Sequence, residues 1–280
     1  MVDSATQSGT VSGFFFGIIL KFVFALLAVV KFVRSFYFQS TYRVEALTLS
    51  PHKTPQIIRN DVTKLSKVPR HIAVILDRKQ KHVEGGGVEG LLSDVGEVAA
   101  WCIGAGASEL TVYERTGVLK SLPLQDVYNA IEDRLRMYFG NSSSATFKIF
   151  NRQNDGTKSL GPSAAGSADP KLLINLISES NGRKLIVDVT RVLSDMVAQN
   201  VTSPKDITLD VIDRQLKERI GSEPDLLIMF SSEIDLQGYP PWHIRVTEIY
   251  CSPANNGNVS YLVFMKALHA FATAKFKLGR

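Results

Sequence analysis

The chain has 280 residues, of which 45% are hydrophobic and 21% are charged, with 20 glycines and 11 prolines. This composition is typical of a globular protein of one or two domains and excludes collagen-like, coiled-coil and wholly disordered classes. The formal net charge of +5 favours an anionic partner such as a phosphate, a nucleic acid or a lipid surface. The two cysteines, Cys102 and Cys251, are too few for a disulfide scaffold and have no zinc-ligand spacing, which indicates a reducing compartment.

Residues 11–30 (VSGFFFGIILKFVFALLAVV) form an apolar stretch of about the 20 residues that a helix needs to cross a bilayer. Only Lys21 interrupts it, at a cost of about 2.5 to 3.5 kcal/mol, and each Leu, Ile, Phe or Val offsets about 0.3 to 0.6 kcal/mol of that cost. We therefore predict an N-terminal membrane anchor over residues 1–35. The alternatives are a helix that lies in the membrane interface and a cleaved signal peptide, which is disfavoured because no basic residue precedes the apolar stretch.

The segment 36–70 is predicted to be a basic juxtamembrane linker. Basic residues follow the apolar stretch, among them Lys31, Arg34, Arg43, Lys53 and Arg59. Only the acidic Asp3 precedes it, so the positive-inside rule places the large C-terminal part in the cytosol. The same basic residues favour contact with an anionic membrane surface.

From residue 71 the chain alternates short apolar segments with segments of helical spacing, which predicts an α/β domain over residues 71–280 with a parallel sheet flanked by helices. We expect strands at residues 71–76, 110–113 and 147–150, separated by helices around residues 91–102 and 123–138. Residues 154–170 are rich in Gly, Ser, Ala, Pro and Asp and have no apolar period, so we predict a mobile surface insertion there.

The remaining elements are predicted from shorter apolar patterns. They are a helix at 172–178, a strand at 184–189, a helix at 209–220, a strand at 225–230 and a helix at 261–276. The last helix is apolar nearly all round, and its Phe264 and Leu268 are predicted to contact another subunit. The alternative is that this helix is central to its own domain.

Asp77 follows the first predicted strand, where open α/β sheets bind their ligands. The glycines of residues 85–90 do not match a phosphate-binding loop, so this segment alone predicts a flexible loop. Glu248 follows a Pro-Pro-Trp turn, and two carboxylates from separate strand ends could hold Mg²⁺ with a diphosphate. The alternative is that both acids are ordinary surface charges.

Four ordered blocks make the region from residue 71 to the C-terminus resemble the cis-prenyltransferase family. They are HIAVILD (71–77), GVEGLLSDVGEVAAWCIGAGASELTVYERT (87–116), PDLLIMFSSE (224–233) and PPWHIRVTEIY (240–250). The resemblance implies a cis-prenyltransferase fold. Catalytic members of that family condense isopentenyl diphosphate onto an allylic diphosphate with Mg²⁺.

The chain departs from the family's catalytic pattern at the positions that bind diphosphate. Asp77 matches the catalytic aspartate, but the Gly-Asn-Gly-Arg loop after it is replaced by residues 78–81 (RKQK), and Phe-Ser-x-x-Asn by residues 114–118. Two basic positions are replaced by Met229 and Asp235, which removes guanidinium donors and adds repulsion toward a diphosphate. Glu248 matches the family's second acid. Without the anionic ligand the pair has little reason to hold Mg²⁺, so we interpret both acids as vestigial.

This combination resembles the Nogo-B receptor type of accessory subunit, which pairs with a catalytic homologue in dehydrodolichyl diphosphate synthase at the endoplasmic reticulum. The resemblance implies a non-catalytic, activating subunit of a heterodimer that supplies polyprenyl diphosphate for dolichol and protein glycosylation, with Mg²⁺ held in the partner's active site and no cofactor bound by this chain. The chain ends in Lys277, Leu278, Gly279 and Arg280, which resemble the C-terminal R-x-G of such subunits and are predicted to bind substrate in trans. The alternatives are an active homodimeric prenyltransferase and a membrane-tethered scaffold or receptor without a catalytic role.

Overall fold

The computed structural model describes residues 17, 19–30, 55–81, 85–140, 146–153, 156–161, 169–253, 255 and 257–274, which belong to two units, Met1–Thr48 and Leu49–Arg280. In the first unit, residues 17 and 19–30 are helical, and large apolar side chains such as that of Phe22 are exposed. Residues 11–16 and 18 of the predicted membrane span lie outside the described residues. Across the described parts of the chain, no helix combines the length and the apolar character needed to cross a membrane.

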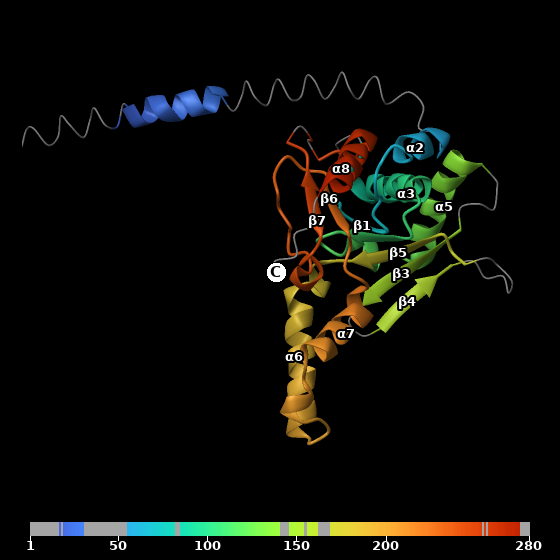
Figure 1. Cartoon of the computed structure of the whole chain (residues 1–280), viewed down its shortest axis with the longest axis vertical. Coiled ribbons are helices and arrows are strands. Elements are labelled where there is room, and N and C mark those ends of the chain that lie inside the picture. The colour runs from blue at the N-terminus through green and yellow to red at the C-terminus, as the bar shows by residue number, and fades with distance from the viewer. Residues whose placement is uncertain are drawn as a thin grey trace, which may run out of the picture. The chain divides into compact units, whose positions relative to one another are not determined.

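The second unit is built on one seven-stranded sheet with the strand order β4-β3-β5-β2-β1-β6-β7 (Figure 1). The strands are β1 (His71–Ile75), β2 (Glu109–Tyr113), β3 (Phe147–Gln153), β4 (Gly156–Leu160), β5 (Leu172–Ile177), β6 (Leu226–Met229) and β7 (Glu248–Cys251). Neighbouring strands are parallel except for β3 and β4, which pair antiparallel. The predicted parallel sheet is therefore confirmed, with one antiparallel strand at its edge.

Helices lie on both sides of this sheet, with α6 and α7 on one side and α2, α3, α5 and α8 on the other (Figure 1). Their bounds are α2 (Pro55–Val62), α3 (Gly87–Ala105), α4 (Val118–Ser121), α5 (Leu124–Phe139), α6 (Arg183–Ala198), α7 (Leu209–Ile220) and α8 (Tyr261–Thr273), with 3₁₀ turns η1 (Glu179–Asn181), η2 (Pro204–Asp206) and η3 (Pro241–His243). The helix α2 lies within the predicted linker. Its Ile58 is fully buried against Gly104 of α3, where an added Cβ would come within 2.8 Å of the Ile58 side chain.

The strands are apolar on both faces because each face is covered by helices. On one face, Ala73 and Ile75 of β1 pack in a buried cluster with Leu185 of α6 and Leu216 of α7. On the other side, the fully buried Trp101 of α3 packs against two aromatic rings of α8. Its ring lies 5.6 Å from that of Tyr261 and 5.5 Å from that of Phe264, and its indole N–H donates to the Tyr138 hydroxyl at 3.2 Å.

Three of the predicted elements are wrong. The segment predicted as a helix at 172–178 is the interior strand β5, and the strand predicted at 184–189 is the start of helix α6. Both are short apolar segments in which a buried strand and a buried helix give similar patterns. The third is part of the insertion predicted at 154–170, where Gly156–Leu160 forms strand β4 and pairs with β3.

Helix α8 is central to its own domain, which was the alternative in the sequence analysis. Phe264 and Leu268 have no exposed surface within the single chain, and Phe264 packs on Trp101. The prediction that these two side chains contact another subunit is therefore corrected. An apolar surface nearly all round the helix is explained by burial between the sheet and α3 rather than by a partner.

Candidate functional site

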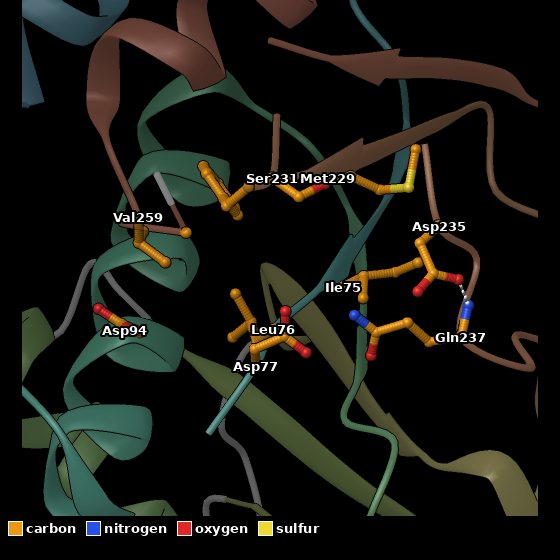
Figure 2. Close-up of a pocket in the computed structure, with 11 residues that line it drawn as sticks. Ile75, Leu76, Asp77, Asp94, Met229, Ser231, Asp235, Gln237 and Val259 are labelled. Atoms are coloured by element: carbon orange, nitrogen blue, oxygen red, sulfur yellow. Dashed lines mark hydrogen bonds between the residues drawn. The ribbon is translucent and has the colours of Figure 1, made fainter. Parts of the chain in front are cut away.

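The sheet reverses its strand order at β1, and this reversal creates a crevice at the carboxyl ends of the strands. From β1 the chain passes to β2 on one side, whereas β6 pairs with β1 on the other side. Ligands of open α/β sheets bind outside the carboxyl ends of the strands at such a point. The structure has a small cavity there, lined by residues that follow β1 and β6 and by α3 (Figure 2).

Three aspartates line this acidic cavity: Asp77, Asp94 and Asp235 (Figure 2). Asp77 follows β1, Asp94 lies on α3, and Asp235 lies in the segment after β6. The Asp235 carboxylate accepts a hydrogen bond from the backbone N–H of Gln237 at 2.9 Å. Burial raises the pKa of Asp94, and nearby Lys79 partly opposes this shift. The walls of the cavity therefore carry negative charge. Two of these acids, Asp77 and Asp235, lie at positions that the sequence analysis assigned to the family's site.

Among the described residues that line the acidic cavity there is no lysine or arginine. Met229 lines it at one of the positions where the family resemblance implies a basic residue. Lys79, from the segment that replaces the family's phosphate loop, instead donates to the Asn258 side chain at 2.7 Å, and its carbonyl accepts from Gly87 N–H at 3.0 Å. These contacts connect the substituted loop to the segment before α8 and to the start of α3.

The acidic cavity is also too small for the ligand of a prenyl-transfer site. Its volume is about 10 Å³, which is close to the room that one water molecule needs. A diphosphate occupies several times that volume and carries two or more negative charges, which the three carboxylates would repel. The small volume and the three carboxylates both disfavour a diphosphate in this arrangement of side chains.

Comparison with known proteins assigns the chain to a family. It is 40% identical to the "Dehydrodolichyl diphosphate synthase complex subunit nus1" of Schizosaccharomyces pombe, over 81% of this chain and 83% of that protein. It is 32% identical to the subunit NUS1 of Saccharomyces cerevisiae, over 99% of this chain and 77% of that protein. The chain belongs to the NUS1 family of dehydrodolichyl diphosphate synthase complex subunits. No protein-family model matches it.

The fold of this NUS1 family member is also found in a solved structure. The crystal structure of lavandulyl diphosphate synthase from Lavandula x intermedia in complex with dimethylallyl diphosphate is 18% identical, with a TM-score of 0.50 over 76% of this chain and 99% of that one. This likeness supports the cis-prenyltransferase fold predicted from the sequence blocks.

The structure does not bring together Asp77 and Glu248, the two acids that the sequence analysis interprets as vestigial. Glu248 pairs with Leu226, which pairs with Ile72, so Glu248 lies at the amino ends of the parallel strands. Asp77 lies beyond the carboxyl end of β1, five residues after Ile72, which places the backbone of the two residues about 16 Å apart along the strand direction. Within one chain they cannot share a Mg²⁺ ion. In addition, no three His, Cys, Asp or Glu side chains of the described residues are grouped to hold a metal.

The remaining predicted site residues, Lys277, Leu278 and Gly279, lie outside the described residues. Sequence reasoning missed Asp94, although it lies on the predicted first helix. No motif marked it, because its contribution depends on the packing of α3 beside the end of β1. The signal that could have found it is its place in the first turns of the helix that follows Asp77.

Proposed function

We propose that this chain is the non-catalytic, activating subunit of a heteromeric cis-prenyltransferase that makes long-chain polyprenyl diphosphate for dolichol and protein glycosylation. The observation that carries this proposal is the acidic cavity. At the place where the fold would bind a diphosphate, three aspartates and no described cation line a space of about 10 Å³. A chain of this family with such a site requires a second subunit to perform the chemistry.

The proposed partner is a catalytic cis-prenyltransferase subunit that binds isopentenyl and allylic diphosphates and holds Mg²⁺ in its own active site. The names of the yeast relatives, which are subunits of a synthase complex, support a partner of this kind. The proposed contribution of this chain is its C-terminal tail, because backbone N–H groups beside Gly279 and the ammonium of Lys277 suit a diphosphate.

We further propose that the partner docks on the groove between α6 and α7. The groove has a volume of about 310 Å³ and is lined by apolar side chains including Val189, Leu193 and Met196, with Arg214 and Arg219 beside them. Val192 at its rim is 46% exposed. An exposed apolar surface of this kind is typical of a contact site between proteins, and α8 no longer qualifies because its apolar residues are buried.

The complex is proposed to act at the endoplasmic reticulum membrane with the large unit in the cytosol. The exposed apolar side chains of residues 19–30 and the basic residues after them support an anchor, whether it spans the membrane or lies in its interface.

The test of the proposed function is prenyl transfer with and without the partner. The full chain is purified from its native membrane with its associated proteins and, separately, alone in neutral detergent. Long-chain product from the complex and none from the isolated chain is the expected result. Product from the isolated chain would support an active homodimer, and an associated protein without prenyl-transfer activity would support a scaffold.

The docking surface is tested with one substitution on each of two helices. Val192→Asp on α6 is expected to abolish co-purification with the catalytic subunit, because a carboxylate would be buried in an apolar contact. The matched control is Met137→Asp on α5, because Met137 is an apolar residue that is 75% exposed and does not line the groove. Loss of the partner only with Met137→Asp would move the interface to α5.

A further inference from the structure

A second site lies at the same edge of the sheet, beyond the ends of β2 and β5, and none of its lining residues belongs to the acidic cavity. It is an open hollow of about 620 Å³. Three cations line it, namely Arg115, Lys120 and Lys184, against one acid, Glu179. Hydroxyl and backbone groups make up the rest of the wall. We call this region the basic hollow.

Hydrogen bonds fix the floor of the basic hollow. The Lys120 ammonium donates to the Asn181 side-chain oxygen at 2.7 Å and to the Ser180 hydroxyl at 3.2 Å. The Ser178 hydroxyl, on a residue that is 4% exposed, lies 2.9 Å from the Ser180 hydroxyl. The Ser178 backbone N–H donates to Asn181 at 3.1 Å, which holds the η1 turn in place. A cation and two hydroxyls are thus positioned before any ligand arrives.

The turn that carries Arg115 is shaped by a buried carboxylate. Glu114 is 2% exposed and accepts hydrogen bonds from the backbone N–H groups of Thr116 at 2.8 Å and Val118 at 2.7 Å, and from the Thr116 hydroxyl. Gly117, at φ 77°, allows the left-handed conformation that this turn requires. The negative charge of Glu114 is therefore engaged inside the turn and does not line the hollow.

Arg115 is able to exchange its present partner for a ligand. Its guanidinium lies 3.4 Å from the Glu179 carboxylate, and both side chains are more than half exposed. Exposed ion pairs of this kind contribute little stability, so a more highly charged anion in the hollow competes well for the guanidinium. A phosphate provides several acceptor oxygens and up to two charges, which suits an arginine fork and two lysines.

We propose that the basic hollow binds a phosphate or diphosphate group carried on a larger molecule. The volume exceeds that of the anionic group itself, and the open mouth leaves room for the rest of the ligand. Two sources share this chemistry, a soluble isoprenoid-type diphosphate and the headgroup of a phosphomonoester lipid. Arg115 and Gly117 belong to residues 114–118, which replace the family's Phe-Ser-x-x-Asn, whereas Lys120 and Lys184 lie outside that segment. The proposal concerns binding by this chain and not product formation, so it can fail or hold separately from the proposed function.

The first arm of the test measures binding of inorganic pyrophosphate to the full chain in neutral detergent by calorimetry. The double variant Arg115→Gln/Lys184→Gln is expected to weaken binding by about tenfold or more, since it removes two charge-assisted contacts. The matched control Arg191→Gln/Lys205→Gln changes the net charge equally, at two exposed residues of α6 and η2 outside the hollow. It is expected to bind as the unaltered chain does, and Arg115→Lys/Lys184→Arg is expected to retain binding.

The second arm uses the full chain reconstituted in phosphatidylcholine vesicles with or without phosphatidic acid. Protection of Lys120 and Lys184 from acylation, read by mass spectrometry, is expected with added pyrophosphate for either source. Protection by phosphatidic acid without pyrophosphate is expected only if the source is a lipid, and its absence would indicate a soluble ligand. The proposal is overturned if neither probe protects these lysines, or if the two double variants lose pyrophosphate binding equally, because that result would indicate only a non-specific attraction to a basic protein.

Discussion

The acidic cavity and the basic hollow lie at neighbouring strand ends of one sheet. They differ in charge, in volume and in the hydrogen bonds that stabilise them. The first, at β1 and β6, has three aspartates around about 10 Å³, whereas the second, at β2 and β5, has three cations around about 620 Å³. Both occupy the edge where α/β sheets bind ligands. The difference shows that the fold supplies a location, and that the side chains placed there decide whether an anion is accepted or repelled.

The largest expected effect concerns how much the hydrogen-bonded carboxylates of the two regions contribute to the free energy of unfolding. Glu114→Ala removes the buried carboxylate under the basic hollow, leaves its backbone donors unpaired, and is expected to lower the free energy of unfolding by about 3 kcal/mol. Asp235→Ala, in the acidic cavity, removes one exposed hydrogen bond and is expected to cost less than about 1 kcal/mol. Urea unfolding of the full chain, followed by circular dichroism, measures both. Equal losses of unfolding free energy for the two variants would show that neither carboxylate stabilises its region more than the other.

The second effect concerns turnover in the complex. Deleting Lys277 to Arg280 is expected to leave the heterodimer assembled and to lower kcat by about 10²-fold, the scale of losing one preorganised group that stabilises an anion. Pyrophosphate binding by the isolated chain is expected to stay unchanged, since the basic hollow does not include the tail. Gly279→Ala tests close backbone approach alone. A complex without the tail that has normal kcat and KM would contradict the proposed role of the tail.

A smaller effect is the pH dependence of stability that Asp94 gives to the acidic cavity. Because burial raises the pKa of Asp94, the folded state binds its proton more tightly than the unfolded state, and the charged form costs stability at neutral pH. Asp94→Asn is expected to raise Tm at pH 7, and this gain is expected to shrink as the pH falls through the raised pKa toward the ordinary value of 3.8. Melting curves across this range check the sign. A gain that does not change with pH would indicate packing as its cause.

The smallest effect is expected at Asp77. In the complex, Asp77→Asn is expected to change kcat by less than about twofold, whereas loss of a working acid–base group costs about 10²- to 10⁴-fold. The prenyl-transfer assay of the assembled complex provides the measurement. A loss on the larger scale would show that the acidic cavity takes part in the reaction and that Asp77 is not vestigial.

Sequence reasoning predicted the parts of the fold with long or regular patterns. The helix predicted at 209–220 matches α7, and the strands predicted at 71–76 and 110–113 match β1 and β2 within one residue at each end. The pattern failed at β5 and at the start of α6, where a short, mostly apolar segment fits either structure and only longer context separates the two. Strand β4 carries no apolar signal, because four of its five residues are exposed and its backbone pairing alone places it in the sheet.

Only part of the candidate site could be predicted, because some of its residues belong to ordered sequence blocks and others are brought together only by the fold. Asp77, Met229 and Asp235 were found because ordered sequence blocks fix their places at strand ends, and the structure brings them into one cavity. Glu248 also belongs to such a block, but its position at the opposite edge depends on strand register, which a single sequence does not specify. The basic hollow combines residues from four separate elements, so no local pattern could have revealed it.

The two tryptophans of the chain give separate optical reporters for the two sides of the sheet. Trp101 is fully buried beside α8, whereas Trp242 is partly buried near α7, donates to Asp213 at 2.9 Å and stacks with Arg245. Trp242→Phe leaves only the fluorescence of Trp101, with the blue-shifted emission of an indole shielded from water. A partner that docks between α6 and α7 would change the emission of Trp242 and leave that of Trp101 as an internal reference.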